Sequence, residues 1–456
     1  MTSLTNASNA LNAQQYGLDV TGQNIANINT SGYARRQVQL AEVALPGGGS
    51  DGGVTIVGAP AQRDAFLEAR LRAEQPIERQ NGAVADSLSV VQTALGGAGS
   101  SLDGALSAFF QSFGTLAQDP TSSVARDGVV RQGTQLAASF NDLSSQFDTS
   151  IKTADAQIRG GLTEINALAS QIASLNAAIG GANGADAEAL KDKQSVAITS
   201  LTQLAGVNVM ARSDGGVDVT VGNGRALVIG ANTYALGATS TPPSGQAAIT
   251  SGGVDITSEV SGGQVGGWLQ VRDTLVPGYK SQLDQLAMTV AQQVNAVHSA
   301  GYDLSGKAGG NFFTPIAAAP GAAAAIAVNP ALAADSSLVA ASQTGTSGDN
   351  QTAKALAALA DAPVAGGGTA TFTQAWSQLV YKIGSDAQTA QSNQENHQTI
   401  LSAVQRLRDS VSGVSLDDEA TSLMTFQRGY QANAKYFSTV NTVLDVLFGM
   451  AGVTLS

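Results

Sequence analysis

The two ends of this 456-residue chain carry the same seven-residue spacing of apolar side chains. Near the N-terminus the spacing joins Leu4, Leu11, Leu18 and Ile25. Near the C-terminus it joins Leu423, Tyr430, Phe437 and Leu444, with Phe426, Val440 and Leu447 at the complementary heptad positions. Such a repeat is typical of helices that pack along a narrow seam. Each end is therefore predicted to form a helix that needs a partner.

The N-terminal stripe is thin, because the rest of that segment is crowded with amides. They are Asn9, Asn12, Gln14, Gln15, Gln23, Asn24 and Asn27. An isolated amphipathic helix of this kind is marginal in water without tertiary packing. We expect the N-terminal stripe to pack against the C-terminal stripe, within one subunit or across neighbouring subunits. Packing between subunits is the hypothesis we favour for the terminal helices.

Heptad spacing also runs through the interior of the chain. One stretch places isoleucine at positions 151, 158, 165, 172 and 179, and Gly160-Gly161 interrupts it without ending the pattern. A second stretch covers 371–412, and a shorter amphipathic segment covers 283–297. Stripes of this kind usually pack within their own protein. The helical parts are therefore predicted to form an elongated bundle.

Between 206 and 264 the period changes to two, which predicts an antiparallel β meander inserted between helices. Alternating valines at 207–209 and 217–221 flank a turn at 214–216, and a second turn follows at 222–224. A smaller hairpin is expected near 38–57, with the loop Leu45-Pro46-Gly47-Gly48-Gly49. Residues 301–370 are rich in Ala, Gly and Pro, and we expect loops and short strands there.

The predicted fold class is α+β, mainly helical: an elongated, coiled-coil-like bundle with an inserted antiparallel β side domain. Residues 1–35 and 414–456 would form a terminal coiled-coil domain. Residues 36–205, 265–300 and 371–413 would form the helical bundle, including the hairpin. Residues 206–264 would be the inserted β domain, and 301–370 an irregular segment.

Composition excludes several classes of function. The chain has no cysteine and two histidines, so disulfides, thiolate metal sites and cysteine nucleophiles are absent. The net charge of −12 leaves no basic face for nucleic acid. No Lys or Arg precedes Arg35, so the N-terminus lacks the basic region of a secretory signal peptide. No apolar run is long enough to span a bilayer.

Three motifs could carry chemistry, and each is better explained structurally. Gly301–Ala308 resembles a phosphate-binding loop, but Ala308 lacks the required hydroxyl and the segment follows a helical pattern, so we interpret it as a glycine-rich turn. His298 and His397 lack partners at metal-ligand spacing. The cluster Asp417-Asp418-Glu419 fits the first turn of a helix. No catalytic, cofactor-binding or metal-binding residue is predicted, and the chain is not expected to be an enzyme.

The segment from Asn24 to Arg35, NIANINTSGYAR, resembles the N-terminal signature of the bacterial flagellar axial proteins, the family of rod, hook and hook-associated proteins. The closing segment, with Gly413–Glu419 and Tyr430-Gln431-Ala432-Asn433-Ala434-Lys435, is similar to the closing helix of that family. The chain length, the helical pattern over 140–205 and the segment 266–273 look most like the hook-associated protein 1 (FlgK) branch. The signature residues are Asn24, Asn27, Asn29, Gly32, Tyr33 and Arg35.

This resemblance implies a structural role at the hook–filament junction, outside the cell. It implies contacts with the flagellar hook protein, with hook-associated protein 3 (FlgL) and with further copies of the chain in the junction ring. It also implies unfolded export through the flagellar type III apparatus. The export chaperone FlgN would mask the stripe from Leu416 to Leu447 before export, and no cofactor is implied.

Three alternatives remain open from the sequence. A hook or distal-rod protein shares the terminal signatures but lacks the long helical segment around Ile151–Ile179. A secreted coiled-coil adhesin or effector would explain the acidity but not the paired terminal signatures. A hydrolase inserted at 206–370 would need a nucleophile, a base and a stabilising group, and no convincing set is present.

Overall fold

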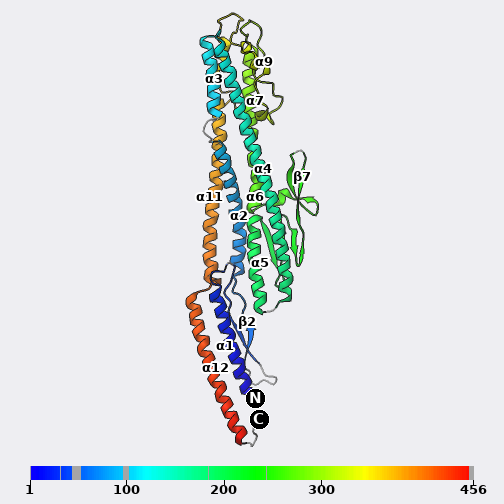
Figure 1. Cartoon of the computed structure of the whole chain (residues 1–456), viewed down its shortest axis with the longest axis vertical. Coiled ribbons are helices and arrows are strands. Elements are labelled where there is room, and N and C mark those ends of the chain that lie inside the picture. Colours follow the sequence, from blue (N-terminus) through cyan, green and yellow to red (C-terminus); the bar gives the residue numbers. More distant parts are fainter. Residues whose placement is uncertain are drawn as a thin grey trace.

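The computed structural model describes residues 2–30, 32–43, 53–95, 102–182, 184–242 and 244–450. Ser31 of the signature and the predicted loop 45–49 lie outside these ranges. The molecule is long, narrow and mostly helical, with small antiparallel sheets beside the helices (Figure 1). The predicted fold class, a mainly helical α+β chain, is confirmed. Among the described residues, no helix has the length and apolar character needed to cross a membrane.

The two terminal helices form their own layer at one end of the molecule. Helix α1 (Thr2–Ala26) lies along helix α12 (Leu416–Met450), and both extend the long axis below the other helices (Figure 1). A two-stranded hairpin, β1 (Gln39–Glu42) and β2 (Val54–Gly58), contacts α1. The heptad stripes therefore predicted both terminal helices correctly. We call α1 and α12 the terminal pair.

The body of the molecule, from α2 to α11, is built on long helices. They are α2 (Ala65–Leu95), α3 (Leu102–Gln118), α4 (Ser123–Gly181), α5 (Gly184–Leu204), α7 (Val276–Ser299) and α11 (Phe372–Ser412). Helix α11 begins with a capping box between Thr371 and Gln374, which satisfies two backbone groups at its first turn. Helices α2 and α11 pack along each other, and α4 runs most of the length of the body (Figure 1).

Helix α4 passes straight through Gly160-Gly161, as the sequence predicted. A Cβ at Gly161 would lie 2.8 Å from Val265 Cγ2 and 3.2 Å from Trp268 Cζ3, both on helix α6 (Gly263–Gln270). The glycine is therefore present because α6 approaches too closely for a side chain. A π-helical turn, η2 (Val271–Leu275), then joins α6 to α7.

The inserted segment forms two small antiparallel sheets rather than one continuous meander. The first holds β3 (Val207–Ala211), β4 (Val217–Val221), β5 (Arg225–Ile229) and β6 (Asn232–Thr233). The second holds β7 (Leu236–Thr241), β8 (Gln246–Ser251) and β9 (Val254–Asp255), and the 3₁₀ turn η1 (Thr257–Glu259) follows. Gly215 and Gly224 have positive φ at the tight turns of the first sheet, where a side chain would be strained.

The body contains two apolar clusters. One lies under the sheets, where Val219, Leu227 and Ile249 pack with Ile158 and Ile172 of α4. The other is formed by the first half of α4 with α2, α3, α7, α11 and the 301–370 segment. Trp268 packs against both clusters, so α6 connects them. Burial of this apolar surface is the main force that holds the body together.

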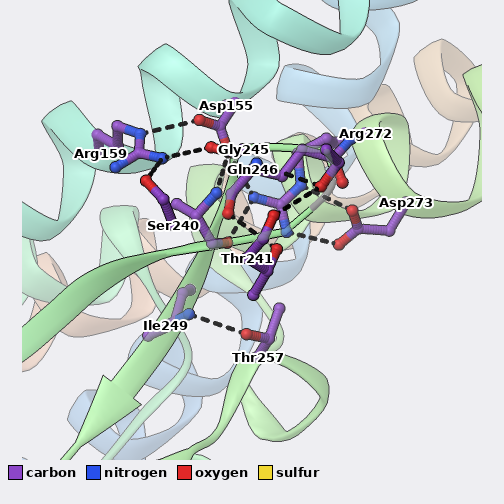
Figure 2. A network of polar contacts seen from close by, with 12 residues as sticks. Asp155, Arg159, Ser240, Thr241, Gly245, Gln246, Ile249, Thr257, Arg272 and Asp273 are labelled. Carbon is purple, nitrogen blue, oxygen red and sulfur yellow. Dashed lines mark hydrogen bonds and ion pairs between the residues drawn. The ribbon is translucent and has the colours of Figure 1, made fainter.

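A polar network fixes the second sheet to the helices (Figure 2). Asp155 on α4 accepts hydrogen bonds from Arg272 (2.8 Å), from Arg159 (2.8 Å) and from the Ala247 amide (2.7 Å). Burial alone would raise the pKa of Asp155, but these three hydrogen bonds lower it overall. Arg272 is 3% exposed and also donates to Ala247 O at 2.8 Å. The hairpin of β7 and β8 is therefore attached near its turn to both α4 and η2.

The expectation of loops and short strands over 301–370 was only half right. The segment contains short helices, namely α8 (Ala322–Ala325), α9 (Pro330–Ala334), η3 (Ser336–Leu338) and α10 (Gln351–Ala358), and its extended parts form single bridges such as Phe313↔Val328. Alanine favours helix even in runs too short to show a heptad, which explains the difference.

Candidate functional site

The terminal pair meets along a seam of very close approach. A Cβ at Gly17 would lie 2.5 Å from the Phe426 ring, and a Cβ at Gly429 would lie 2.6 Å from Gln14 Oε1. Both distances are shorter than an ordinary Cβ contact. The Gln14 side chain could move aside for a Cβ at Gly429, but the Phe426 ring leaves no space for one at Gly17. The seam therefore depends on small residues as much as on leucines.

The predicted N-terminal stripe lies at the edge of this seam rather than at its centre. Leu4, Leu11, Leu18 and Ile25 are all half-buried. The buried residues of α1 are Ala7, Ala13, Gly17, Val20, Thr21 and Asn24. The leucines were predicted from their size and spacing, whereas the seam centre consists of residues too small or too polar to stand out in a hydrophobic pattern.

The predicted C-terminal stripe faces α1 but is incompletely covered. Leu423, Phe426, Phe437, Val440 and Leu444 are half-buried, whereas Tyr430 is 39% exposed and Leu447 is 55% exposed. Beyond Glu419, no described residue of α12 is buried. Further apolar side chains of α12 are exposed: Met424, Tyr436, Val443, Val446 and Met450. The terminal pair thus leaves much of its apolar surface open, which is a feature of surfaces that bind other proteins.

The upper end of the terminal pair is closed by a polar cluster around Asn24. The Asn24 amide donates to Arg36 O (2.9 Å) and to Glu419 Oε2 (3.0 Å). Its oxygen accepts from the Tyr33 hydroxyl (2.8 Å) and from the Arg36 amide (3.0 Å). Asn24 is 1% exposed, so all four bonds replace water that the side chain has lost. One signature residue therefore ties α1, the following loop and α12 together.

The consecutive residues Arg35 and Arg36 form ion pairs with different parts of the molecule: Arg35 with the terminal helix α12 and Arg36 with helix α5 of the body. Arg35 Nε donates to Glu419 Oε1 on α12 at 2.7 Å. Arg36 pairs with Asp192 on α5 at 3.2 Å, and Arg63 pairs with the same carboxylate. Successive side chains of an extended backbone point to opposite faces, which explains this division. We call this cluster, Asn24, Tyr33, Arg35, Arg36, Arg63, Asp192 and Glu419, the joint.

Burial affects the titration of two residues of the joint. It raises the pKa of the Tyr33 hydroxyl, although the positive charge of Arg36 opposes the change. It also raises the pKa of Asp192 above its ordinary value, because the loss of water outweighs the attraction of Arg63 and Arg36. The Arg36 guanidinium also lies over the Tyr33 ring, 5.3 Å from its centroid.

The remaining signature residues shape the loop that leads into the joint. Two observations favour glycine at position 32. Its φ of +80° is strained for any residue with a side chain, and a Cβ there would lie 2.5 Å from Val196 Cγ2 on α5. The Asn27 amide donates to Gln23 O at 2.9 Å and caps the end of α1. Asn29 is exposed. The joint residues that the sequence did not reveal are Arg36, Arg63 and Asp192, because their pairing joins distant segments.

The other motifs have structural roles. Glu419 lies in the first turn of α12 as predicted, but it is 2% exposed and serves the joint. His298 is fully buried, and His397 contacts Glu74 with 2.8 Å between Nδ1 and Oε2. In the segment 301–308, the Asp303 carboxylate accepts from the amides of Ser305 and Lys307, which closes a turn.

Three family models match this chain. The flagellar hook-associated protein FlgK helical domain matches residues 88–313. The C-terminal model of the flagellar basal body rod FlgEFG proteins matches residues 408–450, and the flagella basal body rod protein model matches residues 4–33. The two shorter matches fall on the terminal pair, and the long one falls on the body.

Similar proteins extend over the whole chain. Flagellar hook-associated protein 1 of Escherichia coli (strain K12) is 27% identical over 98% of this chain and 99% of its own length. The protein of the same name from Bacillus subtilis (strain 168) is 27% identical over 99% of this chain and 98% of its own. The solved structure of the flagellar hook junction protein FlgK from Burkholderia pseudomallei shares the fold, with a TM-score of 0.66 at 18% identity, covering 76% of this chain and all of that one. Over nearly its whole length the chain is therefore similar to flagellar hook-associated protein 1 (FlgK), a structural component of the bacterial flagellum.

Proposed function

We propose that this protein forms the junction between the flagellar hook and the filament. One observation carries the proposal: the terminal pair extends beyond the body and leaves its apolar stripes half-covered, so it is built to be completed by neighbouring subunits. The similarity to flagellar hook-associated protein 1 over nearly the whole chain supports the same role, because a hook-associated protein is expected to contact other components of the hook and filament.

The proposed partners follow from the resemblance of the two termini. The hook protein would contact one end of the junction, hook-associated protein 3 (FlgL) would contact the other, and copies of this chain would pack side by side in a ring. The exposed residues Tyr436, Val443 and Leu447 would be covered in that assembly. Before assembly, the export chaperone FlgN would cover the same helix while the chain awaits type III export to the outside of the cell.

Electron microscopy of flagella from cells lacking this protein tests the proposal. We expect completed hooks without filaments and flagellin shed into the medium. Rods without hooks would place the protein lower on the flagellar axis, in the rod or hook class. Normal filaments would contradict a structural role and would favour a secreted effector. Re-expression of the wild-type chain should restore the filaments.

A further inference from the structure

The contact between the terminal pair and the body is narrow. On the α11 side the chain continues into α12, and the Arg35 amide donates to Ser412 O at 2.9 Å; on the α5 side the contact is mostly charged. The bases of the hairpin, residues 35–37 and 60–62, hydrogen-bond to each other and form a crosspiece between α12 and α5. On the α5 side, the crosspiece is held by Asp192 with Arg36 and Arg63, by Glu188 Oε2 accepting from the Ala61 amide at 3.4 Å, and by the close approach of Gly32 to Val196. Within this contact, the Asp192 carboxylate pairs with two cations, Arg36 and Arg63.

Two clefts flank this contact. One has a volume of about 880 Å³ and lies between the loop that follows α1 (residues 27–30 and 32–35, the signature loop), α2, α5 and the lower part of α11. The other, of about 500 Å³, lies between the signature loop, the end of α4 and α5. Residues Asn27, Thr30 and Tyr33 line both clefts. The signature loop therefore separates two open clefts. If the charged contact with α5 broke, the terminal pair would have space to tilt relative to the body.

From this geometry we propose that Asp192 is a positioning residue, a latch that fixes the angle between the terminal pair and the body. Removing the charge of Asp192 would leave Arg36 and Arg63 facing each other without a counter-ion, and Arg36 is 7% exposed. Loss of one partner from a buried ion pair is strongly unfavourable, because the remaining charge stays desolvated. The crosspiece would then separate from α5. The proposal rests on the proposed function in one respect: a fixed angle between the terminal pair and the body would help the chain to assemble into the junction.

The chain is well suited to a distance measurement, because it contains no cysteine and any introduced pair is unique. We would attach spin labels at Asn12→Cys on α1 and Asn396→Cys on α11, two exposed positions on either side of the joint. At 1.5 Å of rise per residue, the two sites lie roughly 45 Å apart along the long axis, within reach of double electron–electron resonance. The sample would be the purified full-length chain.

We expect one narrow distance distribution for the chain with Asp192. In Asp192→Asn, the distribution should broaden and move to shorter distances, because any tilt away from the extended arrangement brings the labels together. Asp192→Glu should restore much of the narrow distribution, and Arg63→Gln should give an intermediate one. Asp186→Asn is the matched control: Asp186 is an exposed carboxylate on α5 that lines the same cleft, and no ion pair involves it among the described residues.

The thermal unfolding midpoint of the body should be the same in Asp192→Asn and Asp186→Asn, so that a change of angle is distinguished from unfolding. A distance distribution in Asp192→Asn that superimposes on that of the parent chain would overturn the latch. That result would leave the junction role intact, because the microscopy of cells lacking the protein decides that question independently.

Discussion

At the scale of single residues, the buried polar side chains of this protein connect segments that are far apart in the chain. Asn24 joins α1 to Glu419, Asp192 joins α5 to the crosspiece, and Asp155 joins α4 to the second sheet. A buried polar group is costly unless it is hydrogen-bonded, so each of these contacts specifies one arrangement of the elements it links. The histidine at the end of α7 does the same for the 301–370 segment.

His298 predicts a pH dependence of stability. Its Nε2 accepts from the Ala340 amide at 2.9 Å, so the ring is neutral and its Nδ1 donates to Gly310 O at 2.7 Å. Burial lowers the pKa of His298 to about 4 from the ordinary 6.5. The unfolded chain therefore binds a proton between these pH values that the folded chain does not. The stabilisation is complete above pH 6.5 and is lost as the pH falls toward 4.

The expected loss is about 2 kcal/mol of unfolding free energy between pH 7.5 and pH 5 from this residue. Urea unfolding at the two pH values measures it. His298→Gln should be less stable at pH 7.5 but should show a smaller drop on acidification than the wild type. Equal drops in the two proteins would show that His298 is not the group responsible.

At the scale of elements, packing in the terminal pair depends on the closeness of two helices. At Gly17 the Phe426 ring packs directly on the α1 backbone, so the two helices approach most closely where α1 lacks a side chain. Interiors are packed densely enough that even one added carbon is felt. The distance between α1 and α12 is therefore set by a few residues around Gly17 and Phe426, not by the whole length of the apolar stripe.

Alanine at Gly17 and at Gly22 should have opposite effects. Both residues lie on α1, but a Cβ at Gly17 would meet the Phe426 ring, whereas a Cβ at Gly22 would have nothing within 4 Å. Gly22→Ala should stabilise the helix by up to about 1 kcal/mol, through helix propensity alone. Gly17→Ala should weaken the pairing, because overpacking costs about 1–3 kcal/mol. Hydrogen exchange of the α1 amides measures both, and faster exchange in Gly22→Ala than in Gly17→Ala would contradict the argument.

Elements with a sustained period were predictable, and those without one were not. The isoleucines of α4 and the alternating valines of β3 and β4 indicated those elements correctly. Helix α3 was not singled out, because its repeat is short. Leu102, Phe109 and Leu116 are seven residues apart, but the stretch covers only about two heptads and does not stand out as a sustained period. The joint could not be predicted either, because Asp192 and Arg36 are far apart in the chain and no local pattern links them. The signature was visible only as a resemblance, and its chemistry became clear from the fold.

At the scale of the whole molecule, the body and the terminal pair differ in how completely they bury their apolar residues. The body has two apolar clusters with many side chains that are inaccessible to solvent, such as Phe109 and Ile172. The terminal pair has buried small residues on α1 and half-buried large ones on α12. The body thus buries its apolar residues within a single chain, whereas the terminal pair leaves apolar surface open, which the proposed junction contacts would cover.

This difference predicts that a charged terminal stripe will separate folding from assembly. Replacing both Leu11 and Leu18 by Asp places two carboxylates on half-buried positions that would be fully covered in the junction. A buried, unpaired charge is strongly unfavourable, so the subunit contact should fail. The body contains neither residue, and its thermal unfolding midpoint should stay at the wild-type value.

The matched control is Asn12→Asp with Gln15→Asp, which adds the same charge at partly or fully exposed positions of α1. Immunogold electron microscopy of hook tips measures incorporation. We expect gold label at the hook tips with the control and none with the Leu11 and Leu18 variant. Normal labelling with both would mean that the leucine stripe is not covered in the assembled junction, and that the exposed apolar side chains of α12 alone make the subunit contact.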